Sequence, residues 1–303
     1  MGLIDGDPGI GWSTFADAVT ASAEWSHSGI AVLPDGRAAF SAPGEGRIVL
    51  VDPVDDGPAE LLDVPMAVGH GMVVSEGRLL LADIGTGRGD GQVLRVSPES
   101  GRAVRAVEPP PAIQDAWRPT SVAVGPDGTI WVADGYGQSL VHGFRPDGGI
   151  LTVDGSETGL AFDCPHGIAV DDRSPEPLLV VADRVNRRLV FLHLDGRLDR
   201  VVEHPLFSYP SSIARRGDVL LVTDLHGALL RLGPDDAVDA VLPIADPDRD
   251  AAWPNVDRDG TLSRPDLRDG VLRSPHGIAV APDGAVLLTE WHLGGRQIRL
   301  AHL

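Results

Sequence analysis

The chain has 303 residues, 43% of them hydrophobic, and a formal net charge of −19, with no lysine among its basic residues. So acidic a chain is expected to repel nucleic acids and anionic membranes, and the lack of lysine excludes Schiff-base chemistry on a lysine side chain. Its single cysteine, Cys164, excludes an internal disulfide and favours a reducing compartment. The sequence has neither a signal-peptide pattern nor an apolar stretch of the roughly 18 residues that a membrane span needs. We therefore expect a cytoplasmic protein without nucleic-acid or membrane partners, and the sequence sets no oligomeric state.

Short apolar strands recur along the whole chain. Each is followed by a Gly or Asp-Gly turn, by a second apolar run such as RLLLAD at 78–83, and by a third such as QVLRVS at 92–97. Three or four short strands in a repeat of roughly 45 residues are typical of a β-propeller blade. The sequence therefore predicts an all-β fold, a six-bladed propeller, in a single domain over residues 1–303. The residues that open the six first strands are Ser28, His70, Thr120, His166, Ser211 and His276, spaced by 42, 50, 46, 45 and 65 residues.

The last repeat ends after its third strand, at Leu303. The segment FADAVTASAE, residues 15–24, precedes the first repeat and is predicted to supply the missing outer strand of the last blade. Such a closure would tie both ends of the chain into one blade and remove exposed strand edges.

Histidines open the first strands of blades 2, 4 and 6: His70, His166 and His276. First strands line the central channel of a propeller, so alternate blades place these side chains about 120° apart around the axis. Three converging imidazoles with an open position are typical of catalytic zinc, although imidazole also suits Cu, Fe and Ni. The alternative is a hydrogen-bonded scaffold residue copied by duplication, which does not explain the choice of alternate blades. We predict a metal site, with Zn²⁺ as the first choice.

Two further groups of histidines are set aside. His27 lies one position out of register with the openers, and we exclude it from the site. His142 falls in an outer strand and is expected to be solvated, as are the histidines at 193, 204 and 302.

The ends of the second strands should lie on the same face as the histidines. An acidic residue recurs there in nearly every blade, and we interpret it as an acceptor for turn amides. Tyr136 and Arg184 are not repeated, which a scaffold role explains less well. Tyr136 is a candidate general base if a metal lowers its pKa, and Arg184 is a candidate clamp for a carboxylate or oxyanion. The acidic residues are Asp83, Asp134, Asp183, Asp224 and Glu290.

These motifs resemble a known family. The stretch WRPTSVAVGPDGTIWVADGYGQS at 117–139, followed by CPHGIAV…VVADRVNRRL and SPHGIAV…TEW, is similar to NHL-repeat six-bladed propellers and, within them, to peptidyl-α-hydroxyglycine α-amidating lyase. The match extends through blades 2, 3, 4 and 6, about half of the chain. The resemblance implies zinc on the three predicted histidines, Tyr136 as the base, Arg184 in contact with substrate, and cleavage of the N–C bond of a carbinolamide.

The chain departs from the family pattern at three positions. Pro43 stands where the family has a further catalytic arginine, Gly277 replaces an aspartate that binds structural calcium, and Gly137 replaces a half-cystine. We infer a related catalytic core that acts on a different substrate from peptide-amide precursors. Arg88, in a Gly-rich loop of blade 2, is a candidate substitute for the missing arginine.

The longest step between repeats contains the insertion ADPDRDAAWPNVDRDGTLSRPDLRDG, residues 245–270. It should emerge on the histidine face, and long loops without regular structure are often lids or binding loops. Trp253 and Asn255 are predicted to cover the pocket and bind substrate. Three aspartates have the spacing of a calcium loop, but Ala251 stands where that loop needs glycine, so calcium is not favoured. These aspartates are Asp246, Asp248 and Asp250.

Three functions remain open at the level of sequence. The first is a zinc-dependent lyase acting on a small molecule with a hydroxyl group next to nitrogen. The second is a hydrolase, isomerase or cyclase that uses the same metal as a Lewis acid. The third is a non-catalytic NHL propeller that binds partners, which gives no reason for histidines on alternate blades.

Overall fold

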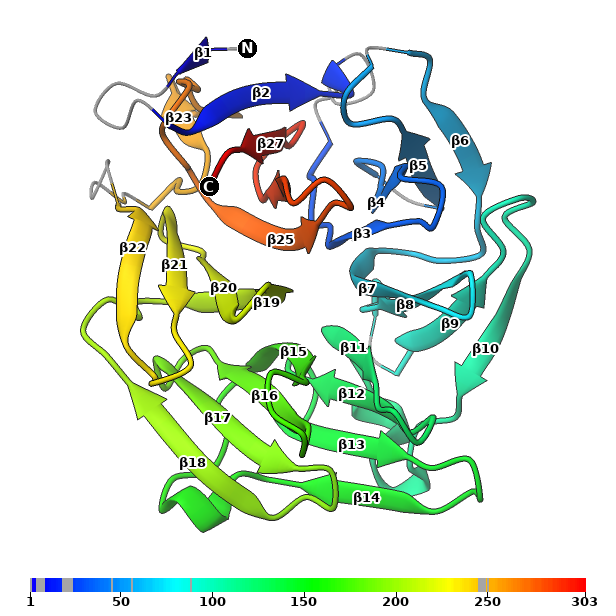
Figure 1. Ribbon diagram of the computed structural model, residues 1–303. Coiled ribbons are helices and arrows are strands. Elements are labelled where there is room, and N and C mark those ends of the chain that lie inside the picture. The colour runs from blue at the N-terminus through cyan, green and yellow to red at the C-terminus, as the bar shows by residue number, and fades with distance from the viewer. Residues whose placement is uncertain are drawn as a thin grey trace.

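The computed structural model describes residues 2–3, 9–17, 24–44, 46–55, 57–87, 89–244, 249 and 251–303. Six antiparallel sheets surround a central axis, as Figure 1 shows. The predicted six-bladed propeller is confirmed. Within the described residues, no helix is long and apolar enough to cross a membrane.

Each blade has four strands, numbered from the channel outward. Blade 1 has β3 (Ile30–Val32), β4 (Ala38–Ser41), β5 (Arg47–Val51) and β6 (Glu60–Asp63). Blade 2 has β7 (Gly69–Ser75), β8 (Arg78–Asp83), β9 (Gln92–Val96) and β10 (Ala103–Val107). Blade 3 has β11 (Ser121–Val124), β12 (Ile130–Asp134), β13 (Leu140–Phe144) and β14 (Ile150–Val153).

The second half of the ring follows the same plan. Blade 4 has β15 (Pro165–Asp171), β16 (Leu178–Asp183), β17 (Arg188–His193) and β18 (Leu198–Glu203). Blade 5 has β19 (Pro210–Arg216), β20 (Val219–Asp224), β21 (Ala228–Leu232) and β22 (Val238–Leu242). Blade 6 has β25 (Pro275–Val280), β26 (Val286–Glu290) and β27 (Gln297–Ala301). Two 3₁₀ turns, η1 (Pro111–Ala116) and η2 (Ser156–Thr158), lie between blades.

The N-terminal strand closes blade 6, as predicted, but from a different segment. β2 (Gly11–Phe15) pairs with β27, and β1 (Gly2–Leu3) pairs with β2 at the outer edge. The predicted segment, 15–24, was therefore wrong in its bounds, and residues 18–23 lie outside the described part of the chain. The reason is packing: Trp12 and Phe15 enter the core between blades, whereas the predicted segment offers alanines.

The core consists of apolar clusters between neighbouring blades. In β8, Leu79 and Leu81 pack against blade 1, while Leu80 and Ala82 pack against blade 3. Successive strand residues point to opposite faces, so a strand buried on both faces is apolar throughout. This explains the unbroken run LLLA, where a strand with one solvated face would alternate with polar residues.

A glycine follows the opening residue of the inner strand in four blades. A side chain at Gly71 would place its Cβ 2.7 Å from the carbonyl oxygen of Thr120, and one at Gly277 would lie 2.7 Å from the Cα of Gly29. Neighbouring inner strands thus approach too closely for any side chain at these positions. The repeated His-Gly dipeptide combines a channel-facing side chain with this close approach.

The insertion between blades 5 and 6 is not structureless, as the sequence suggested. It contains the hairpin of β23 (Val256–Arg258) and β24 (Thr261–Ser263). Gly260 has a φ of 79°, the left-handed conformation that a tight Asp-Gly turn requires. This turn signal, DRDG, was present in the sequence.

Candidate metal centre

Four histidine side chains meet at one end of the channel. His70, His166 and His276 each lie at the second position of an inner strand, and one nitrogen from each, together with one from His27, lies within 4.8 Å of all the others. The structure therefore brings the three predicted histidines together. The exclusion of His27 from this cluster was wrong.

Local irregularities in the sheets aim these side chains at the axis. The ladder between the first and second strands shifts register beside the histidine in blades 2, 4 and 6. Such bulges redirect a side chain without ending the strand. His27 reaches the cluster differently, because it precedes β3 on a segment whose Ser26 amide donates to the carbonyl of His292 in blade 6.

Each of the three ring histidines is held by the backbone of the next blade. A carbonyl oxygen only accepts, so Nδ1 must carry the proton in each pair, and the Nε2 lone pair is left to face the cluster. The neighbouring blade thus fixes both the tautomer and the ring orientation. The pairs are His70 with Thr120 O at 2.5 Å, His166 with Ser211 O at 2.9 Å, and His276 with Ser28 O at 3.1 Å.

This arrangement leaves acceptor nitrogens with too few donors. The Nε2 atom of His276 is buried without a hydrogen-bond partner in the described structure, and Nε2 of His70 lies 3.2 Å from Nε2 of His27. Unpartnered buried acceptors are costly, and a divalent transition metal would satisfy several of them at once. The residues present therefore fit a metal ion, and their all-imidazole donor set suits Zn, Cu, Fe or Ni.

Burial keeps all four imidazoles neutral. It lowers the pKa of His276 to about 3, and it lowers the pKa values of His27, His70 and His166 well below the usual histidine value. Positive charge on the neighbouring imidazoles and on Arg184 acts in the same direction. Neutral imidazole is the form that binds metals, so the cluster is ready for a metal at neutral pH.

Tyr136 and Arg184 lie against this cluster. The hydroxyl of Tyr136 is 3.2 Å from Nε2 of His166 and 3.3 Å from Nε2 of His27, and Nη1 of Arg184 donates to that hydroxyl at 3.3 Å. The guanidinium also lies over the rings of Tyr136 and Tyr209. Burial raises the pKa of Tyr136, and the positive charge of Arg184 partly offsets this. A bound cation would lower that pKa further.

The acidic residues at the ends of the second strands are turn anchors, as the sequence interpretation held. Asp83 accepts from the amides of Ala67 and Val68, and Asp134 accepts from those of Arg118 and Gln138. The corresponding residues of blades 4, 5 and 6 likewise accept backbone amides. Their oxygens are committed to loops, so the four-histidine cluster contains no carboxylate.

The insertion lies beside the cluster, with its two predicted residues in different roles. The indole of Trp253 contacts Trp291, at 5.8 Å between centroids, and Trp291 in turn contacts His27 at 5.5 Å. Asn255 is fully buried, and its Oδ1 accepts from the amide of Leu293 at 2.9 Å. Asn255 therefore anchors the insertion to blade 6, whereas Trp253 lies near the mouth of the site.

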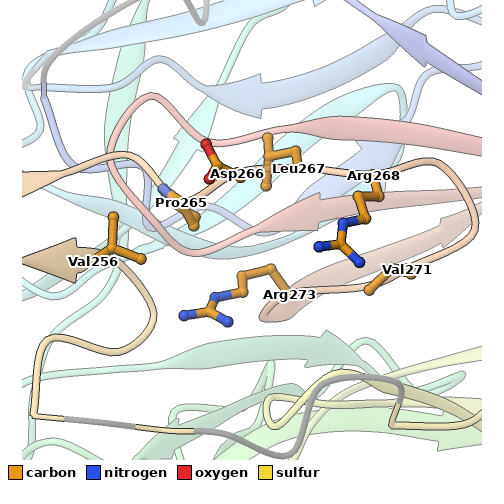
Figure 2. Close-up of a pocket in the computed structure, with 7 residues that line it drawn as sticks. All are labelled: Val256, Pro265, Asp266, Leu267, Arg268, Val271 and Arg273. Carbon is orange, nitrogen blue, oxygen red and sulfur yellow. The ribbon is translucent and has the colours of Figure 1, made fainter.

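Some sequence predictions fall outside this geometry. Arg88 and the candidate calcium aspartates lie outside the described residues. His142 is buried, not solvated: its Nδ1 pairs with the hydroxyl of Thr152, and burial lowers its pKa to about 4. Figure 2 shows a cavity of about 420 Å³ with the guanidinium groups of Arg268 and Arg273 at its wall, formed by the insertion and the segment after it. It shares no residue with the histidine cluster.

Comparisons with known proteins agree with the fold and the motifs. The NHL repeat family matches residues 117–144. A peptidyl-glycine alpha-amidating monooxygenase A of Xenopus laevis is 28% identical over 209 residues, which is 62% of this chain and 20% of the relative. A peptidyl-alpha-hydroxyglycine alpha-amidating lyase 2 of Drosophila melanogaster is 26% identical over 145 residues, 44% of this chain and 35% of the relative. The match thus spans about a fifth to a third of these relatives.

A solved streptogramin B lyase structure has the same fold. It superposes with a TM-score of 0.65 at 18% identity, covering 96% of this chain and 97% of the other. The expected resemblance to NHL-repeat propellers and to amidating lyases is confirmed by these findings.

Proposed function

We propose that this propeller is a metal-dependent lyase that cleaves the C–N bond of a small carbinolamide, a molecule with a hydroxyl group on the carbon next to an amide nitrogen. The observation that carries the proposal is the contact of the Tyr136 hydroxyl with two cluster imidazoles. It places a single acid–base group at the only side of the cluster that a cation and a substrate hydroxyl would share. The resemblance to amidating lyases points to the same reaction class.

The histidines have separable roles in this proposal. His70, His166 and His276 would hold the metal, because neighbouring carbonyls orient all three rings. His27 has no such support and is only half-buried, so it would be the weakest ligand and the one that yields to substrate. A bound divalent metal would supply a Lewis acid that polarises the substrate hydroxyl.

Tyr136 and Arg184 would move the protons and stabilise charge. The phenolate of Tyr136 takes the hydroxyl proton, the carbon–oxygen double bond forms, and the C–N bond breaks with its electron pair going to nitrogen. Tyr136 then returns the proton to nitrogen, so that one carbinolamide gives one amide and one aldehyde or keto product. Arg184 keeps the phenolate accessible by lying next to its oxygen.

The test is release of benzamide from N-(hydroxymethyl)benzamide and from N-benzoyl-α-hydroxyglycine by zinc-loaded protein, followed by chromatography. We expect turnover above the zinc-only rate, and we expect Tyr136→Phe to lower kcat by about 10²- to 10⁴-fold with zinc content unchanged.

The other tyrosine of the chain provides a matched control. Tyr209→Phe removes a hydroxyl group that forms no hydrogen bond in the described structure, and it keeps the ring stacked on His226. Equal losses in the two variants, or no turnover of either substrate by protein that holds one zinc, would reject the lyase and favour another Lewis-acid reaction.

A further inference from the structure

A cavity of about 510 Å³ opens next to the metal centre and shares His27 with it. Its volume is within the range of roughly 300–1,000 Å³ that is usual for small-molecule sites. The proposed function does not use it. Its lining residues are Glu24, Trp25, His27, Gly44, Val68, Ile84, Gly85, Thr86, Arg118 and Trp291.

Flat aromatic rings form one wall of this cavity. The indoles of Trp25 and Trp291 lie 5.5 Å apart at 31°, and the rings of Trp291 and His27 lie 5.5 Å apart at 32°. Trp25 is 41% exposed, although its backbone is fixed by a bridge to Leu293. An exposed indole on a fixed backbone, next to two nearly parallel rings, is suited to stacking with a planar group.

A cation without a counter-ion forms another part of the lining. Arg118 makes no ion pair with any described carboxylate, including the exposed Glu24 of the same cavity, and its Nε is buried without a partner. Its one side-chain hydrogen bond is a long one, from Nη2 to the carbonyl oxygen of Gly85 at 3.5 Å. Guanidinium groups bind carboxylates in a bidentate manner, so Arg118 has donors to offer an anion.

The surroundings of the cavity favour an anion as well. The four histidines are uncharged, Arg184 adds a positive charge, and the carboxylate of Asp134 is occupied by the Arg118 and Gln138 amides. This small region is therefore positive in a chain whose net charge is −19. A ligand that carries one negative charge next to an aromatic group would complement both parts of the lining.

We propose that this cavity is a recognition subsite for a planar aromatic group that bears a carboxylate, with the ring stacked on Trp25 and Trp291 and the carboxylate on Arg118. The placement of this group next to a reacting carbon rests on the proposed function. The binding itself does not, because none of these three residues belongs to the histidine cluster.

Calorimetric titration with indole-3-acetate and its neutral analogue indole-3-acetamide tests the subsite, first on metal-free and then on zinc-loaded protein. We expect the carboxylate to bind at least about tenfold more tightly than the amide in both forms, since a hydrogen bond to a charged group contributes about that much. Arg118→Gln should abolish this difference, Arg118→Lys should restore part of it, and Trp25→Ala should weaken both ligands alike.

The exposed arginine of the same blade, Arg145, supplies the matched control, and Arg145→Gln should bind as the parent does. Equal affinity for the two ligands, or a preference that survives Arg118→Gln, would overturn the proposal. A preference seen only with zinc would overturn it too, because the carboxylate would then be on the metal. Binding as expected in a protein without lyase activity would reject the proposed reaction and leave the subsite intact.

Discussion

The odd and even blades use one register position for two purposes. Blades 2, 4 and 6 place an imidazole there, whereas blades 1, 3 and 5 place a serine or threonine whose backbone carbonyl orients the imidazole of the preceding blade. The even blades therefore depend on a side chain at this position and the odd blades on a main-chain atom. This division accounts for the alternation in the sequence, because the odd blades need only a small residue that lets the inner strands approach.

The largest expected effect comes from removing a supported imidazole. His166→Ala should weaken zinc binding by more than about 100-fold, since it deletes a ligand whose ring the Ser211 carbonyl holds in place. His27→Ala should cost less, about tenfold, because no neighbouring carbonyl fixes that ring. Competition with a chromophoric zinc chelator measures both affinities.

His142→Ala is the control for this comparison, since it removes a buried histidine of an odd blade that lies outside the cluster. Its zinc affinity should equal that of the parent. If His27→Ala weakens zinc as much as His166→Ala, orientation by the odd blades does not determine which ligands bind most strongly.

A smaller effect is expected from disturbing the contact between an even and an odd blade. Gly71→Ala would place a methyl group 2.7 Å from the Thr120 carbonyl oxygen, the acceptor of the His70 Nδ1 proton. Overpacking of this kind costs about 1–3 kcal/mol, and a displaced acceptor weakens metal binding by about 10- to 100-fold. Urea unfolding and zinc competition report the two effects separately.

Gly57→Ala serves as the comparison for that variant, because Gly57 has open space around it. Its unfolding free energy and zinc affinity should match those of the parent within error. If Gly71→Ala lowers stability and leaves zinc affinity intact, the carbonyl acceptors do not control the ligands.

The sequence predicted the blades and the three ring histidines because both follow from periodicity. A strand buried on both faces reads as an unbroken apolar run, and counting along the ladders places the openers at one level of the channel. His27 escaped the same counting because it precedes β3 and crosses toward blade 6 outside any ladder. The only signal was its spacing of one residue from an opener, which is insufficient without the path of the backbone.

The cavity beside the cluster was equally beyond reach of the sequence. Trp25, Arg118 and Trp291 come from the segment before blade 1, from the loop before blade 3 and from the end of blade 6, and none belongs to a repeat. Asn255 shows the reverse case, since an uncommon loop residue suggested a ligand contact and proved to be an anchor. Composition identified both as unusual, but only tertiary contacts separate binding from support.

The smallest expected effect sharpens the comparison most. The hydroxyl of Thr120 is buried and bonds the carbonyl oxygens of Ala133 and Pro165, whereas the metal centre uses only its backbone carbonyl. Thr120→Val removes the hydroxyl and preserves shape, so it should lower the unfolding free energy by about 1 kcal/mol and Tm by about 2 °C. Zinc affinity should be unchanged, as measured with the same chelator. A loss of zinc affinity here would mean that the odd blades act through their side chains, and the alternation would then need a different explanation from the one based on backbone acceptors.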